Sequence, residues 1–266
     1  MKDKIIYFDN EKDNEFSGIS KKTITIDENF KYVHNNIVWK FLSFIAYRII
    51  MPPIAFLWCK IKFHSKMVNK KALKPFKKKG YFIYSNHTLM AADAFIPNLA
   101  TFPQKNYMVV HPDNISTKGT KNFIMMCGAI PTPSSIKAFP NFSRTIKKRI
   151  EDGNAVTIYP EAHIWPYYTK IRKFDHISFS YPVKTNSPVF AFTTTYQKKM
   201  GRTPKITTYV DGPFFADDTK SVRENEKELC EKVYNIMVER SKNSTYEAIK
   251  YIKKEKNYDT DNICGK

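Results

Sequence analysis

The chain has 266 residues, with 44 lysines and arginines against 25 acidic residues and a formal net charge of +19. Hydrophobic residues make up 42% and aromatic residues 15% of the chain, which is enough apolar side chain for a sizeable core and excludes a disordered polyelectrolyte. Neither GxGxxG, a GK[ST] phosphate loop nor GxSxG occurs. The common nucleotide-binding loops and the serine-hydrolase turn are therefore excluded.

The four cysteines, Cys59, Cys127, Cys230 and Cys264, are widely spaced and form neither a CxxC pair nor a cluster with histidine. We therefore expect no disulfide framework and no metal site, and a reducing cytoplasmic environment. Residues 1–36 form a polar segment where a signal peptide would need an apolar stretch, so secretion is not expected.

The most apolar stretch covers residues 37–63. Lys40 and Arg48 interrupt it and Pro52-Pro53 divides it, which predicts two helices instead of one spanning helix. One face of the first helix is apolar and consists of Val38, Phe41, Leu42, Ile45 and Ile49. Two interpretations are open: ordinary core helices followed by a solvated lysine surface, or an amphipathic pair that docks on a membrane with the lysines of 60–79 near anionic lipid. We favour the membrane-docking pair.

After Gly80, short apolar runs alternate with helical patterns. Strands are expected at 81–85, 107–111, 155–159, 189–194 and 206–210, with helices that include 142–150 and 217–240. This alternation predicts an α/β fold with a mostly parallel central sheet flanked by helices. We therefore divide the chain into the polar segment 1–36, membrane-associating helices 37–63, one α/β domain 64–243 and a basic C-terminal tail 244–266.

Polar residues follow the first of these strands. Asn86 and His87 come directly after it, and Asp93 lies six positions beyond the histidine. Working side chains of parallel sheets come from loops at the carboxyl ends of the strands. A histidine whose Nδ1 proton is held by a carboxylate can take a proton from a hydroxyl at Nε2, and a pair without a nucleophilic serine suits direct acyl transfer. Such pairs also occur at capped helices, so the two residues alone do not establish catalysis.

A second group follows the strand at 155–159. Glu161 and His163 come first, and three cations follow: Lys170, Arg172 and Lys173. A carboxylate and several cations close together suit the binding of a polar, phosphorylated molecule. The alternative is a surface loop with ordinary lysines.

Four segments in this order resemble the glycerolipid acyltransferase superfamily, which includes 1-acyl-sn-glycerol-3-phosphate acyltransferase. The resemblance covers about residues 38–215 and rests on Asn86-His87 with Asp93, Gly128-Ala129-Ile130-Pro131, Tyr159-Pro160-Glu161, and the proline-containing segment 186–192. They are similar to the catalytic NH…D motif, a glycine-led strand that helps hold the acceptor, the (F/Y)PEG block and a later strand. The N-terminal helices also resemble the membrane-docking helices of bacterial members.

The resemblance implies that His87 and Asp93 are catalytic and that 64–243 is an acyltransferase domain. It implies substrate-binding roles for Asn86, Gly128, Glu161, His163, Lys170, Arg172 and Lys173. No metal or cofactor is implied, because acyl-CoA or acyl-carrier protein enters as a co-substrate.

Two departures from the family pattern shape these expectations. The family spacing would place the acid at Ala92, so catalysis requires an irregular turn that brings Asp93 within about 3.2 Å of His87 Nδ1. Ala162-His163-Ile164 replaces the family's Gly-Thr-Arg. Either one of the three cations replaces that arginine, or the acceptor carries no phosphate.

The expected function is O-acyl transfer from acyl-CoA or acyl-carrier protein to a lysophospholipid hydroxyl, with 1-acyl-glycerol-3-phosphate as the first choice of acceptor. The expected location is the cytoplasmic face of the cell membrane, where the positive charge suits anionic lipids, coenzyme A and an acidic carrier protein. Two alternatives stay open: a basic nucleic-acid-binding protein, although no recognised motif for that is present, and a catalytically inactive membrane-surface scaffold of the same fold.

Overall fold

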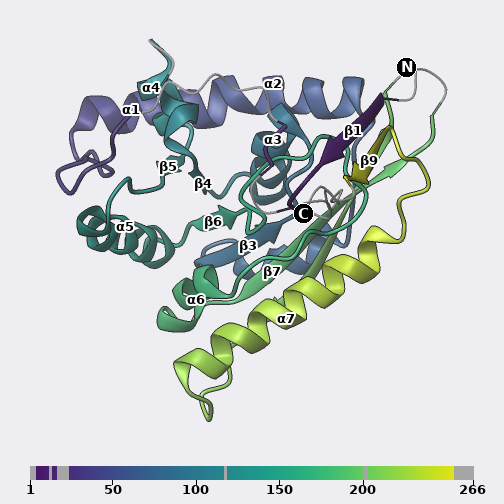
Figure 1. Ribbon diagram of the computed structural model, residues 1–266. Coiled ribbons are helices and arrows are strands. Elements are labelled where there is room, and N and C mark those ends of the chain that lie inside the picture. Colours follow the sequence, from purple (N-terminus) through teal and green to yellow (C-terminus); the bar gives the residue numbers. More distant parts are fainter. Residues whose placement is uncertain (1–3, 12–13, 17–23, 117–118, 200–202, 255–266) are drawn as a thin grey trace, which may run out of the picture.

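A seven-stranded sheet forms the centre of the computed structural model, which describes all residues except 1–3, 12–13, 17–23, 117–118, 200–202 and 255–266 (Figure 1). In the order β2-β8-β7-β3-β6-β4-β5, all neighbours are parallel except β7 and β8. The strands are β2 (Lys66–Val68), β3 (Tyr81–Ser85), β4 (Asn106–Val110), β5 (Ala129–Pro131), β6 (Ala155–Ile158), β7 (Val189–Gln197) and β8 (Lys205–Phe214). The expected mostly parallel sheet is therefore confirmed.

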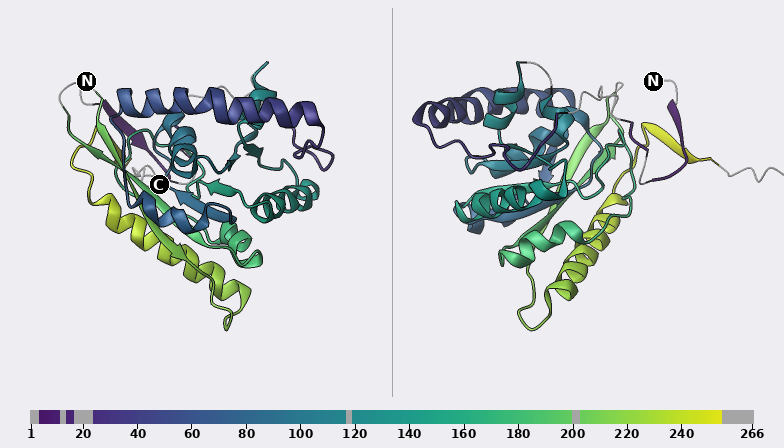
Figure 2. Two further views of the ribbon diagram at one scale, coloured as in Figure 1. Left: turned by 180° about the vertical axis from the view of Figure 1, so that it is seen from behind. Right: turned by 60° about the vertical axis from the view of Figure 1, so that its left-hand side comes forward.

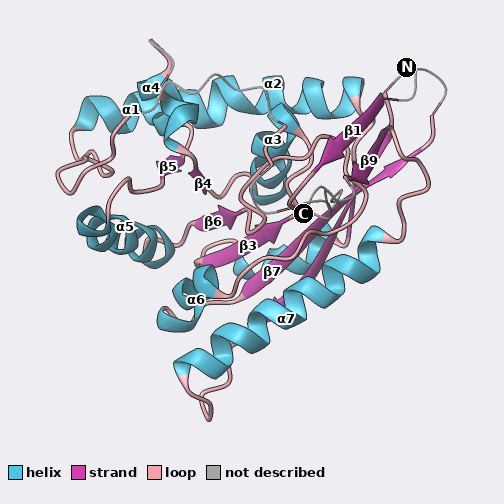
Figure 3. Ribbon diagram, in the orientation of Figure 1, coloured by secondary structure: helices cyan, strands magenta, loops and turns pink. Residues whose placement is uncertain are grey.

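Helices cover both faces of this sheet (Figures 2 and 3). Outside the N-terminal region they are α3 (Met90–Thr101), α4 (Lys121–Met126), α5 (Phe139–Glu151), α6 (Ser180–Lys184) and α7 (Val222–Ser241), with the short 3₁₀ turns η3 (Lys70–Phe76), η4 (Pro112–Ile115), η5 (Ile136–Ala138) and η6 (Ile177–Phe179). The last helix begins after Ser221, which forms a capping box with Glu224, and not at Asp217 as predicted.

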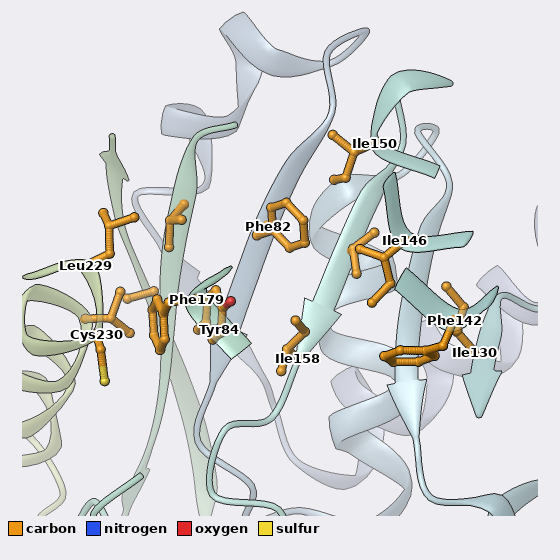
Figure 4. Packing of buried hydrophobic residues seen from close by; sticks show 14 of the residues in the cluster. Phe82, Tyr84, Ile130, Phe142, Ile146, Ile150, Ile158, Phe179, Leu229 and Cys230 are labelled. Carbon is orange, nitrogen blue, oxygen red and sulfur yellow. The ribbon is translucent and has the colours of Figure 1, made fainter. Parts of the chain in front are cut away.

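Side-chain alternation along β3 explains the layers. Phe82 and Tyr84 belong to a core that includes buried residues of α5 and α7, whereas Tyr81 and Ile83 pack on the other face with Ala100 of α3 (Figure 4). All five residues of β3 are buried, as expected for a strand in the middle of a two-sided parallel sheet. The loop after β3 therefore starts from a fixed point.

The N-terminal apolar stretch is one helix, so the prediction of two helices divided by Pro52-Pro53 is wrong. Residues Ile37–Lys62 run without a break through α1 (Ile37–Ile45), η1 (Ala46–Ile50), α2 (Met51–Leu57) and η2 (Trp58–Lys62). Just before the prolines the backbone takes a π-helical turn, in which Met51 N–H donates to Ala46 O. This wider turn accommodates two prolines that would break a regular α-helix. We call Ile37–Lys62 the N-terminal helix.

The N-terminal helix packs on the protein through a stripe of mostly small or polar side chains. Tyr47, Met51, Ala55 and Cys59, at intervals of four residues, are buried, and Ser43 donates to Met126 O. Its large apolar side chains face outward and are exposed, namely Ile37, Val38, Phe41, Leu42, Phe44, Ile49, Ile50, Ile54, Phe56, Leu57, Trp58 and Ile61. The helix is long and apolar enough to cross a membrane, and it could also dock on one.

A second, two-stranded sheet joins the two ends of the chain and was not predicted. β1 (Lys4–Phe8) pairs in parallel with β9 (Ile249–Lys253), within segments expected to be a polar N-terminal segment and a basic tail. Phe8, Trp165, Tyr168 and Tyr251 pack together beneath it. The pairing therefore supports the segment around Trp165, which follows Glu161. Residues 255–266, with Cys264, lie outside the described part of the chain.

The buried hydroxyl of Tyr47 holds the N-terminal helix on the sheet and gives a test of this packing. It accepts a hydrogen bond from Asn106 N–H at 2.8 Å and lies 3.2 Å from Asn98 Oδ1 and Gln104 O. Tyr47→Phe leaves these groups unsatisfied, which should lower the free energy of unfolding by about 1–3 kcal/mol in urea denaturation. Tyr7→Phe, at an exposed position of β1, is the matched control and should change little. Equal stability of both variants would contradict the packing described.

Candidate active site

The side chain of Asn86 fixes the start of the loop that follows β3. Its side chain extends the β3–β7 pairing by one step, because Nδ2 donates to Thr194 O at 3.0 Å and Oδ1 accepts from Thr194 N–H at 2.8 Å. Both ends of the amide are thus occupied and the residue is 1% exposed. Asn86 was predicted to bind substrate, and the structure instead uses its amide to fix the backbone before His87.

The next residues bring a histidine and a carboxylate together. His87 Nδ1 lies 2.8 Å from Asp93 Oδ2, inside the limit that catalysis requires. The extra residue in the spacing is absorbed before the helix, because Leu89 is extended and α3 begins only at Met90. Leu89 N–H donates to the same carboxylate oxygen at 2.8 Å, and Tyr196 holds Thr88 through its hydroxyl at 2.6 Å. The loop is irregular, as expected, and closely tied.

The two members of the pair differ in exposure. The side chain of Asp93 is 3% exposed and that of His87 24%, so the imidazole reaches the surface while the carboxylate does not. Burial raises the pKa of Asp93, against the hydrogen bonds from His87 and Leu89, which lower it. Because Nδ1 faces Asp93, Nε2 is the ring nitrogen left to exchange a proton, and it has no hydrogen-bond partner among the described residues.

Glu161 links this loop to a second one without reaching the surface. Its carboxylate accepts from His87 N–H at 2.9 Å, from Arg172 N–H at 2.9 Å and from the Arg172 guanidinium at 3.2 Å. The side chains of the ion pair are 0% and 1% exposed. Arg172 also donates to His163 O and lies over the Trp165 ring. Glu161 and Arg172 were predicted to bind substrate, but their charges are directed at each other.

Ala162 has a left-handed backbone, with φ of 62°, at the position where the resembling family has glycine. This conformation costs an L-residue roughly 1–2 kcal/mol. The backbone geometry that suits glycine is thus kept although the side chain has changed.

An open cavity of about 680 Å³ lies beside Tyr159, and we call it the active-site cavity. The Tyr159 ring stacks on the His87 ring, with centroids 4.4 Å apart, and also lines this cavity. Much of the wall is apolar, with Val109, Ile136, Phe139, Phe142, Ile158, Phe174 and Ile177. Such a wall suits an apolar chain.

The remaining predicted site residues are placed differently. Lys173 lines the active-site cavity, whereas Lys170 is exposed and outside its lining. The His163 ring lies 3.9 Å from Glu15, with part of its surface exposed. Gly128 precedes β5 at the amino end of the parallel strands, the end opposite His87, so the structure does not bring it to this site. Its glycine is explained by a φ of 108° and by Asn106 O, which lies 2.5 Å from where a Cβ would be.

Sequence reasoning missed three residues that build the site: Tyr159, Thr194 and Tyr196. Tyr159 stacks on His87, Thr194 pairs with Asn86, and Tyr196 holds Thr88. The sequence could have indicated Tyr159, because this residue begins the segment Tyr159-Pro160-Glu161. The described residues contain no group of three or more histidine, cysteine or acidic side chains that could hold a metal ion.

Stability should depend on the ionisation of Asp93. Its raised pKa means that the folded chain holds the proton more tightly than the unfolded chain, so stability falls as the pH rises from the ordinary aspartate pKa toward the folded value. Asp93→Asn keeps an acceptor for His87 and Leu89 and removes the buried charge. We expect a higher free energy of unfolding for this variant at pH 7, and a smaller difference as the pH is lowered.

Urea denaturation at several pH values measures this difference. Asp218→Asn removes an exposed carboxylate and is the control, with little change expected. Lower stability of Asp93→Asn at pH 7 would mean that the charge stabilises the site.

Comparisons with protein-family models and with curated protein sequences find no match. Among solved structures, the chain is similar to the crystal structure of the 1-acyl-sn-glycerophosphate (LPA) acyltransferase PlsC from Thermotoga maritima. The TM-score is 0.50 at 16% sequence identity, over 76% of this chain and 79% of that chain. The chain therefore shares the α/β fold of that acyltransferase.

Proposed function

We propose that this chain is an acyltransferase that moves an acyl group from a thioester to the hydroxyl of a lysophospholipid. The observation that carries the proposal is the 2.8 Å contact between His87 Nδ1 and Asp93. The pair lies at the carboxyl end of β3, in a fold similar to that of an LPA acyltransferase. An apolar cavity suits substrates with long hydrocarbon chains, and Tyr159, which stacks on His87, lines it, although His87 and Asp93 themselves do not.

In the proposed reaction, His87 Nε2 removes the proton of the acceptor hydroxyl as its oxygen attacks the thioester carbonyl. Asp93 stabilises the imidazolium that forms, through the Nδ1 hydrogen bond. The tetrahedral intermediate then expels the thiolate, the imidazolium returns its proton to that sulfur, and an ester and a free thiol leave. Tyr159 limits the rotation of the imidazole by stacking on one of its faces.

For the substrates, we propose acyl-CoA or acyl-carrier protein as donor and 1-acyl-glycerol-3-phosphate as acceptor. Lys173 is the cation of the 170–173 group that lines the active-site cavity, and we assign the acceptor phosphate to it. Arg172 is excluded from that role because its guanidinium is paired with Glu161 in the interior. Asp175 also lines the cavity, so its negative charge offsets that of Lys173.

The N-terminal helix supplies the proposed attachment to the cytoplasmic face of the membrane. Its exposed face carries twelve large apolar side chains, and Lys60 and Lys62 follow at its end. An in-plane helix of this kind buries its apolar face at the boundary of headgroups and acyl chains, while nearby lysines attract anionic lipid. Lipid substrates would then reach the enzyme from the membrane surface.

Removing the proposed base tests the chemistry. His87→Ala should lower kcat roughly 100-fold to 10,000-fold with acyl-CoA and 1-acyl-glycerol-3-phosphate, because a general base contributes on this scale. Asp93→Asn should cost comparably, since the amide does not stabilise an imidazolium. Labelled acyl-CoA and lipid mass spectrometry measure the product.

His111→Ala is the matched control, because this histidine is exposed and its carboxylate partner is Asp113, not Asp93. Full activity of His87→Ala would overturn the mechanism. A folded wild-type protein that is inactive with every donor and a broad lysolipid panel would favour the inactive scaffold.

Removing apolar side chains from the exposed face tests the attachment. The triple variant Phe41→Ser, Ile49→Ser and Phe56→Ser should lose most binding to anionic vesicles in a flotation assay, because hydrophobic insertion provides the salt-resistant part of the affinity. The control variant Ile5→Ser, Phe215→Ser and Val222→Ser removes exposed apolar side chains elsewhere. Equal losses in the two variants would argue against docking through this helix.

A further inference from the structure

A second cavity lies at the opposite end of the sheet from His87. Its volume is about 510 Å³, and we call it the amino-end cavity because it is lined where β4, β5 and β6 begin. The first half of the N-terminal helix forms another wall, with Lys40, Ser43 and Arg48. No step proposed above uses this cavity.

Lys105 lies inside this cavity, where burial disfavours its charged form. Its ammonium group donates to Ser43 Oγ at 2.7 Å and to Met126 O at 2.8 Å, and it lies 5.0 Å from the centre of the Tyr107 ring. Burial, together with the nearby positive charge of Arg149, lowers the pKa of Lys105 to about 8. All its partners are neutral, so the positive charge is not balanced.

Arg149 comes from the last turn of α5 and is also incompletely satisfied. Its Nη2 donates to Tyr32 O at 3.2 Å, and the guanidinium lies over the Tyr107 ring at 4.4 Å. Its Nε is buried and has no hydrogen-bond partner in the described part of the chain. A basic residue here could simply offset the dipole of α5. Both Lys148 and Arg149 line the cavity, but Lys148 is paired with Asp152, whereas Arg149 has a donor without a described partner.

Positive charge is in excess over the whole lining. Five cations, Lys40, Arg48, Lys105, Lys148 and Arg149, face one carboxylate, Asp152. Asp152 pairs with Lys148 at 3.1 Å. The other four cations have no carboxylate partner among the described residues. Lys40 and Arg48 are exposed to solvent, whereas Lys105 and Arg149 are partly buried, and placing these two charges together is unfavourable unless an anion joins them.

We propose that the amino-end cavity binds a phosphate group, and that this phosphate is the phosphomonoester headgroup of an anionic membrane lipid. Several cations with a free guanidinium donor match the charge and the acceptor oxygens of a phosphomonoester. The lipid as its source rests on the proposed docking of the N-terminal helix. Lys40, Phe44 and Arg48 follow one another at four-residue intervals on that helix, each one position after a residue that belongs to its buried stripe or lies in line with it, and Phe44 also belongs to the exposed apolar face. In a docked helix these positions lie at headgroup depth.

Binding is measured in the His87→Ala protein, so that no lipid is turned over and the result does not depend on acyl transfer. The probes are phosphatidylcholine vesicles containing phosphatidate, the same vesicles with phosphatidylglycerol at equal surface charge, monomeric short-chain phosphatidate, inorganic phosphate and coenzyme A. The expected result is a preference for phosphatidate over phosphatidylglycerol, and binding of short-chain phosphatidate that coenzyme A does not displace.

The variant Arg48→Gln with Arg149→Gln should weaken short-chain phosphatidate binding about tenfold or more, on the scale of one charge-assisted hydrogen bond. The control Lys78→Gln with Lys79→Gln removes the same charge from exposed positions outside the cavity. Because Arg149 packs on Tyr107, Arg48→Gln alone provides a variant at an exposed position, and it should also lose part of the affinity.

Equal losses in the two double variants would overturn the site. Displacement by coenzyme A would assign the cavity to a nucleotide, and inorganic phosphate binding as tightly as short-chain phosphatidate would assign it to a soluble anion. Binding of short-chain phosphatidate through Arg48 and Arg149 without any vesicle binding would leave the site standing and overturn the docking of the N-terminal helix instead.

Discussion

The geometry of the candidate site depends on one buried carboxylate, that of Glu161. It accepts hydrogen bonds from the His87 backbone and from both the backbone and the guanidinium of Arg172. Removing either partner of this buried ion pair would leave a buried charge unpaired at a cost of roughly 3–5 kcal/mol, so the two loops keep this contact only while both residues are present. The position of His87 is therefore set before any substrate arrives, which is the condition for positioning a general base. The carboxylate that follows β6 thus holds the backbone of the proposed base.

The sequence predicted the central strands well because burial makes each a short apolar run between helical patterns, as in 81–85 and 155–159. It did not predict the pairing of β1 with β9. The two strands lie at opposite ends of the chain, and neither sequence pattern indicates which strand it pairs with. Residue types identified His87 and Asp93, and their contact follows from the extended Leu89. Gly128 and Arg172 were predicted to bind substrate, because glycine and arginine are common in binding sites. In the structure, glycine allows the left-handed backbone at 128, and Arg172 forms a buried ion pair with Glu161.

The N-terminal helix shows that a pattern of polarity does not by itself tell which face of a helix packs on the protein. Periodicity correctly grouped Phe41 and Ile49 on one face, and a core helix would bury that face. Here the small and polar stripe through Ser43 and Tyr47 packs on the protein, so the apolar face is left outside. The rule that proline divides helices failed here because it assumes α-helical hydrogen bonding. The turn before Pro52 is π-helical, so its hydrogen bonds follow a different pattern.

The N-terminal helix contacts the structure at both ends of the sheet. Its second half, with Met51 and Ala55, packs on Phe95 and Leu99 of α3, the helix that carries Asp93, while its first half lines the amino-end cavity. A headgroup in that cavity would fix how the helix is rotated about its own axis on the membrane. Since α3 is packed on the same helix, that rotation would, in the proposed docking, also set the direction in which His87 faces the lipid surface. Apolar insertion alone fixes depth, whereas a second, directional contact is needed to fix orientation.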